Sequence, residues 1–99
     1  MFGAENLDVL VRTVSATPKE YISGLKQAVP DGVSVDGHEI RVESGAVSIH
    51  IAIKVLPDYV IALMRLPSLQ ATWTFRSGSH DERAECLHRI DWSMKRGGG

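Results

Sequence analysis

The chain has 99 residues, of which 43% are hydrophobic and 23% charged, and its formal net charge is −1. These values exclude intrinsic disorder, and this length has room for only one hydrophobic core. We therefore expect a single α+β domain over residues 1–96 and a flexible glycine tail at 97–99. Eleven Lys and Arg are scattered among twelve Asp and Glu, so no nucleic-acid partner is expected.

The location of the protein is suggested by its one cysteine and by the start of the chain. Cys86 cannot form an internal disulfide, and the start lacks the basic and apolar regions of a secretory signal. The most apolar stretch is interrupted by Lys54, Pro57, Asp58 and Arg65, so no membrane-spanning helix is predicted. We expect a cytoplasmic protein without a membrane partner.

The first element, "NLDVLVRTV", fits two kinds of structure. Leu7, Leu10, Val11 and Val14 fall on one helical stripe, whereas the run of β-branched residues favours a strand. We favour the strand for residues 7–14 and keep the helix as an alternative.

A helix is predicted over residues 17–29. Thr17 is a suitable N-cap, Pro18 suits the first helical position, and Glu20 completes a capping box. Its buried stripe consists of Tyr21, Ile22, Leu25, Ala28 and Val29.

A β-hairpin is predicted next, with its turn at Asp36-Gly37 and with Val35 paired to His38. This register places the apolar side chains on one face: Val33, Val35, Ile40 and Val42. Two further strands alternate between apolar and polar residues. Their inward residues are Val47, Ile49, Ile51, Ile53 and Val55 in the first, and Leu69, Ala71, Trp73 and Phe75 in the second.

The segment "DYVIALMRL" between these two strands is apolar on both parities. A tight turn at Pro67-Ser68 would pair Leu66 with Leu69. This register directs Tyr59, Ile61 and Leu63 outward. The outer sheet face then carries an apolar patch, which can be covered by a second copy of the chain, another protein partner, or the N-terminal segment. The predicted interface residues are Tyr59, Ile61, Leu63, Ala52, Thr72 and Thr74.

The last predicted helix covers residues 79–95. Ser79 and Glu82 form a second capping box. Trp92 falls away from the apolar stripe, so it is either a partner anchor or packs on a loop. The stripe itself consists of Ala84, Leu87, Ile90 and Met94.

The order of elements predicts an α+β two-layer sandwich. Four to five strands form an antiparallel meander, and both helices pack on one face of this sheet. In topology alone this order is similar to an abbreviated helix-grip domain of the START and Bet v 1-like class. The alternative function is therefore binding of a small apolar ligand between the sheet and the last helix, lined by Trp73, Phe75, Leu87 and Met94.

No catalytic or metal-binding constellation is evident. The four histidines lack the spacing of a zinc site, and Cys86 fits a packed thiol better than a nucleophile. The acidic residues of the last helix alternate with Arg83 and Arg89, as on a solvated face. We expect no enzyme activity, no cofactor and no metal.

The C-terminal "KRGGG" has two interpretations. Ubiquitin and small sulfur carriers end in Gly-Gly, which suggests a carrier or accessory role as a second alternative. Here, however, the glycines follow a helix, and Gly97 stands where a helix stop is common. The leading hypothesis is a non-catalytic protein-interaction module that forms a homodimer through its outer sheet face.

Overall fold

The structure, a computed structural model, describes residues 8–97 of the chain. Over this part it contains five strands and two helices in the following order: β1 (Val9–Val14), α1 (Pro18–Ala28), β2 (Val33–Asp36), β3 (Glu39–Ser44), β4 (Val47–Ile61), β5 (Met64–Ser77) and α2 (His80–Gly97).

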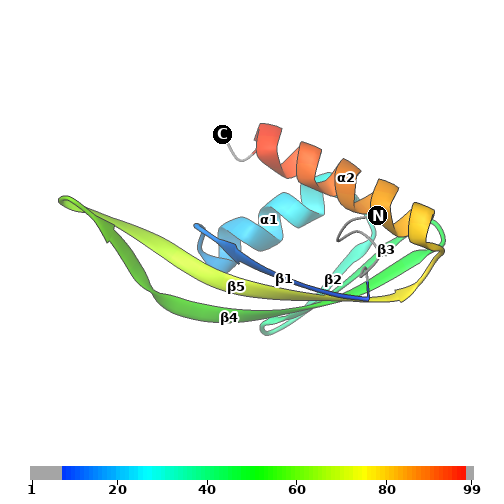
Figure 1. Cartoon of the computed structure of the whole chain (residues 1–99), viewed down its shortest axis with the longest axis horizontal. Coiled ribbons are helices and arrows are strands. Elements are labelled where there is room, and N and C mark those ends of the chain that lie inside the picture. Colours follow the sequence, from blue (N-terminus) through cyan, green and yellow to red (C-terminus); the bar gives the residue numbers. More distant parts are fainter. Residues whose placement is uncertain (1–7, 98–99) are drawn as a thin grey trace.

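The strands form one antiparallel sheet in the order β1-β5-β4-β3-β2. Strands β2 to β5 follow one another as a meander, and β1 lies at the edge beside β5. Both helices cover the same face of the sheet (Figure 1). The predicted α+β two-layer sandwich is therefore confirmed.

The ambiguous first element is a strand. It pairs with β5 from Val9 opposite Thr74 to Val14 opposite Leu69. Leu10 and Val11, which would share one helical stripe, point to opposite faces of the sheet because side chains alternate along a strand. Leu7, the fourth member of that stripe, lies outside the described residues.

Both helices begin at the predicted capping boxes. The Thr17 hydroxyl accepts a hydrogen bond from the Glu20 backbone N–H, and the Glu20 carboxylate accepts one from the Thr17 N–H, at 3.1 and 3.0 Å. Ser79 and Glu82 form the same reciprocal pair at 3.2 and 2.8 Å. Helix α2 extends through Gly97, and the rest of the predicted glycine tail lies outside the described residues.

The β2–β3 hairpin turns at Gly37-His38, one residue later than predicted. Asp36 pairs with Glu39, so Val35 does not pair with His38. Gly37 has a φ of +64°, whereas the φ of His38 is not positive. This combination matches a type II′ turn with glycine in its first central position. Because the pairing differs from the prediction by two residues, an even number, every side chain keeps its predicted face.

The core lies between the inner sheet face and the two helices. The alternation predicted for β4 and β5 is confirmed except at Val55, which is exposed because β3 no longer flanks β4 there. Cys86 of α2 is buried in the core, in agreement with the predicted packed thiol. The buried residues are Tyr21, Leu25, Ile40, Val42, Val47, Ile49, Ile51, Ile53, Leu69, Ala71, Trp73, Phe75, Cys86 and Ile90.

Candidate functional site

The most unusual surface of the molecule is the end of the β4–β5 hairpin, which leaves the body as a two-stranded ribbon (Figure 1). Strand β3 pairs with β4 only as far as Ala52, and β1 pairs with β5 only from Leu69 onward. Residues 55–68, which we call the arm, therefore have their partner strand on one side only. A lone two-stranded ribbon is marginally stable in water, so its exposed surface calls for an explanation.

The arm also overturns the predicted turn. Its tip is Ala62-Leu63, with Ile61 paired to Met64, whereas Pro67 lies within β5. The prediction failed because Ala62 adopts a φ of +55°, a conformation that alanine rarely takes. In "DYVIALMRL" both alternating sets of positions are apolar. This pattern agrees with a projecting arm, because such an arm exposes both of its faces.

A β-bulge lies at the base of the arm. Leu56 pairs with Ser68 and Tyr59 pairs with Leu66, so β4 advances three residues while β5 advances two. The extra residue lies at Pro57-Asp58, and such bulges bend a strand and increase its twist. Figure 1 shows the arm curving toward the side of the sheet that carries the helices.

Beyond this bulge the arm is amphipathic. Directly paired residues share a face, so Tyr59 and Leu66 lie on the same side as Ile61 and Met64. We call these four side chains the apolar arm face. The opposite face carries the pair Val60 and Arg65, and the Arg65 guanidinium lies 3.6 Å from the Asp58 carboxylate.

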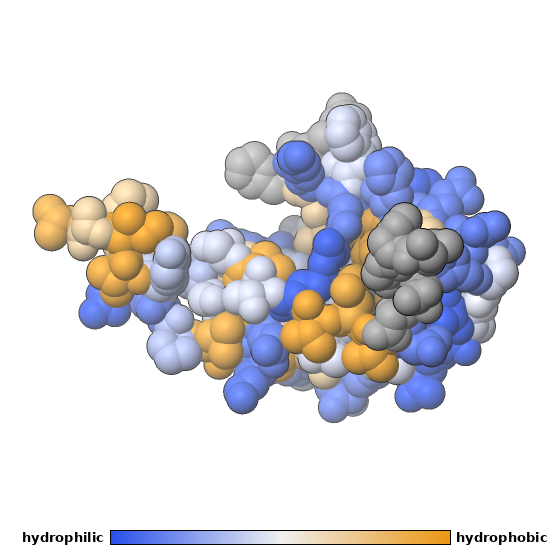
Figure 2. Space-filling view, in the orientation of Figure 1, coloured by the Kyte–Doolittle hydropathy of each residue, from blue (hydrophilic) through white to orange (hydrophobic). Residues whose placement is uncertain are grey.

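The exposure of the arm is high for apolar side chains. Leu63 at the tip is 99% exposed, and Tyr59, Ile61 and Met64 are 59%, 48% and 60% exposed. Figure 2 shows apolar residues gathered on the arm, clear of the body. Tyr59, Ile61 and Leu63 belong to the predicted interface, and Met64, which was not among the predicted residues, lies beside them on the arm.

The other predicted interface residues lie elsewhere. Ala52 and Thr72 form a cross-strand pair on the outer sheet face, and Thr74 on the same face pairs with His50. All three are half-buried above the core. The predicted register would have placed Leu63 opposite Thr72, so the expected continuous patch over the outer face is replaced by two separate surfaces.

The predicted ligand pocket between the sheet and α2 is filled by protein. Trp73 and Phe75 are buried with ring centroids 6.2 Å apart, and Leu87 packs against them as part of the core. Met94 instead lines an open groove of about 800 Å³ between α1, the C-terminal part of α2 and the base of the arm. We call this the root groove; its lining also includes Val14.

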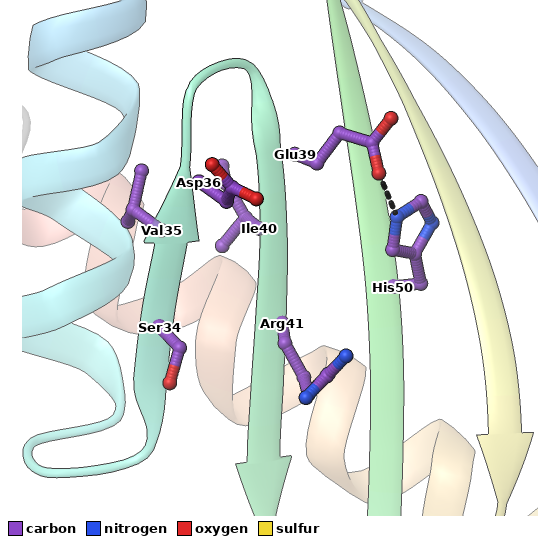
Figure 3. A pocket seen from close by; sticks show the side chains of 7 residues that line it. All are labelled: Ser34, Val35, Asp36, Glu39, Ile40, Arg41 and His50. Atoms are coloured by element: carbon purple, nitrogen blue, oxygen red, sulfur yellow. Dashed lines mark hydrogen bonds and ion pairs between the residues drawn. The ribbon is translucent and has the colours of Figure 1, made fainter.

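A smaller hollow of about 250 Å³ lies between β2, β3 and β4 (Figure 3). Its Glu39 and His50 side chains point toward each other with their oxygen and nitrogen 3.0 Å apart. Arg41, paired with His50 across the strands, and Asp36 add one charge of each sign. With mixed charges and wide exposure, this hollow does not favour an ion of either sign.

Among residues 8–97, no three His, Cys, Asp or Glu side chains converge on a position that would hold a metal ion. Cys86 is buried, and this burial raises the pKa of its thiol, which disfavours the reactive thiolate. Trp92, considered above as a partner anchor, is 56% exposed on α2. It is therefore accessible on the surface of α2.

No protein-family model matches this chain, and no curated protein matches its sequence. No helix within residues 8–97 is long and apolar enough to cross a membrane.

Proposed function

We propose that the protein is a non-catalytic, cytoplasmic protein-interaction module that associates with a second copy of itself through the arm. The observation that supports this proposal is the arm's exposed, one-sided apolar face. Contiguous apolar surface of this kind is rare on soluble monomers and marks interaction sites when it occurs. Covering it would also remove the instability of a free two-stranded ribbon.

The nature of the arm favours contact through side chains over addition of a strand to its edges. Pro57 and Pro67 lack a backbone N–H, and the bulge distorts the β4 edge. Both features block edge-to-edge pairing, a common route to uncontrolled aggregation. A closed dimer packed through the apolar arm face is therefore expected in preference to an open fibre.

The test is the solution mass of the wild-type chain by light scattering across a dilution series. We expect a dimer that Leu63→Asp converts to a monomer with an unchanged circular dichroism spectrum. Thr72→Asp is the matched control, because it places the same charge on the outer sheet face above the core and should leave the dimer intact. A wild-type monomer at every concentration would contradict the proposal, as would a dimer lost in Thr72→Asp and kept in Leu63→Asp.

The carrier role of the terminal glycines remains a prediction, since Gly98 and Gly99 lie outside the described residues. The role as a binder of a small apolar ligand now applies to the root groove, since the core fills the predicted pocket. Thermal stabilisation by a medium-chain fatty acid, suppressed by a Met94→Glu substitution, would support that alternative.

A further inference from the structure

We infer that the tip of the arm, centred on Leu63, docks in the root groove of a second copy. The two arms then lie side by side in opposite directions, related by a two-fold axis. This inference rests on the proposed self-association and specifies which surface of the second copy receives the arm.

The position of the groove relative to the arm is the first argument. Leu66 and Pro67 of the arm line the root groove, and Leu63 lies three residues further out. At about 3.4 Å per residue, the tip reaches roughly 10 Å beyond the groove of its own chain. When two such arms lie antiparallel, each tip lies opposite the base of the other arm, where the groove is. A single two-fold operation therefore fills both grooves.

The lining of the groove combines apolar side chains with the charged residues Lys19, Glu20 and Lys95. Val14 of β1, Tyr21 of α1 and Met94 of α2 contribute apolar surface, and Gly24 contributes no side chain at all. A Cβ atom placed on Gly24 would lie 3.1 Å from Met94 Cε, so the glycine keeps this wall open. Methionine is flexible and adapts its shape to an incoming apolar group. A volume of about 800 Å³ is ample for the tip of a hairpin.

Leu66 connects the arm with the groove. Leu66 belongs both to the apolar arm face, through its pairing with Tyr59, and to the lining of the root groove. A second arm lying along this surface would contact Ile61 and Met64 before its tip reaches Met94.

The available area is sufficient for a dimer. The apolar arm face and the tip carry four apolar side chains that are each about half exposed or more, namely Tyr59, Ile61, Leu63 and Met64. At roughly 100 Å² each, one arm offers on the order of 400 Å². Two arms in contact and the two groove surfaces that receive their tips would bury about 1,000 to 1,200 Å² in total, at the lower end of the range for specific interfaces. The formal charge of −1 adds little repulsion between the copies.

Cysteine cross-linking tests the docking directly. Ser23 lines the root groove and is exposed, so the double variant Leu63→Cys/Ser23→Cys should form a disulfide-linked dimer under mild oxidation. Leu63→Cys alone should not cross-link, because antiparallel arms keep the two tips apart. Leu63→Cys/Arg76→Cys should not cross-link either, since Arg76 is exposed at the far end of β5. The native Cys86 is buried and should not interfere.

A charge at the groove gives an independent readout. Ser23→Arg should weaken the dimer by about tenfold or more, without loss of the folded spectrum, because the long charged side chain would occupy the space that receives the apolar tip. If Leu63→Asp yields a monomer while Ser23→Arg and the groove cross-link have no effect, docking in the groove is wrong and arm-mediated association stands. A cross-link from Leu63→Cys alone would also overturn the antiparallel arrangement. A wild-type monomer at all concentrations would overturn both proposals.

Discussion

Arg12 on β1 and Asp91 on α2 are joined by two parallel hydrogen bonds, with Nη1 and Nη2 of the guanidinium 2.5 and 2.8 Å from the two carboxylate oxygens. Arg12 belongs to the inner face of the sheet, where its neighbours along the strand are apolar. Its guanidinium also lies 5.5 Å from the centre of the Trp73 ring. The hydrogen bonds to Asp91 raise the pKa of Arg12 above its ordinary value, so the cation persists throughout the accessible pH range.

Loss of this pair should destabilise the fold. We expect Arg12→Gln to lower the free energy of unfolding by about 1 to 2 kcal/mol, because a bidentate charged pair is worth more than a neutral one but here is partly screened by solvent. Arg65→Gln is the matched control, and its exposed pair with Asp58 should contribute less than about 0.5 kcal/mol. Urea denaturation of both variants measures the difference. Equal losses would show that Arg12 and Asp91 form an ordinary surface pair.

Arg12 illustrates a limit of sequence patterning. Alternation assigns apolar residues to the core and charged ones to solvent, and this rule placed most of β3, β4 and β5 correctly. It gives no sign that an arginine on the inward parity of β1 will meet a carboxylate 79 positions later. Asp91 was accordingly assigned to the solvated side of its helix. A long-range pair depends on tertiary packing, which local pattern does not encode.

The arm illustrates a second limit. Helix caps and strand alternation follow local chemistry, so the two capping boxes and the layers of the fold could be predicted. The position of the β4–β5 turn could not be predicted, because Ala62 adopts a positive φ there. Glycine is the residue that normally indicates such a turn in a sequence. Tyr59, Ile61 and Leu63 could therefore be identified as exposed apolar residues from the sequence. They were expected on the outer face of the sheet, whereas they lie on the arm, beyond the ends of the flanking strands β1 and β3.

A buried hydrogen bond between Tyr21 and Trp73 should also contribute to stability. The indole N–H donates to the Tyr21 hydroxyl at 2.9 Å, and Trp73 is fully buried. Tyr21→Phe leaves that donor without a partner, which should cost about 1 to 3 kcal/mol. Thr13→Val is the control, because it removes an exposed hydroxyl from β1, outside the arm, and should change stability by less than about 0.5 kcal/mol. Chemical denaturation followed by tryptophan fluorescence compares them, and a neutral Tyr21→Phe would contradict the role of this bond.

Two glycines should respond to alanine for different physical reasons. A Cβ on Gly32 would lie 2.3 Å from the carbonyl oxygen of Glu43 and 2.6 Å from Val29 Cγ1, so the backbone would have to move. Gly37 has open space around it but a φ of +64°. We expect Gly32→Ala to cost about 2 to 4 kcal/mol through steric overlap. Gly37→Ala should cost about 1 kcal/mol through backbone strain.

Thermal unfolding followed by circular dichroism measures both glycine variants under identical conditions. We expect the melting temperature of Gly32→Ala to be lower than that of Gly37→Ala. If Gly37→Ala were the more damaging change, close packing of the segment after α1 against β3 would not be the dominant constraint. The hydrogen bond from the Glu43 N–H to the Gly32 carbonyl, 2.8 Å long, holds these two segments together.

The buried thiol of Cys86 should make the fold less stable at alkaline pH. Burial raises the pKa of Cys86, so the folded chain holds its proton at a pH where the unfolded chain has already released it. The stability that this group contributes is fully present below the ordinary thiol pKa. It declines as the pH rises above about 8.5, by no more than about 1.4 kcal/mol per pH unit.

The experiment compares wild type with Cys86→Ala, and the free energies of unfolding of both chains are measured from pH 7.5 to 10. Wild type should lose more, because the alanine variant lacks the titrating group while both chains retain Tyr21. Reaction of the wild-type thiol with a maleimide should be slow until the chain unfolds, and rapid labelling of the folded chain, or parallel pH profiles of the two chains, would contradict this account.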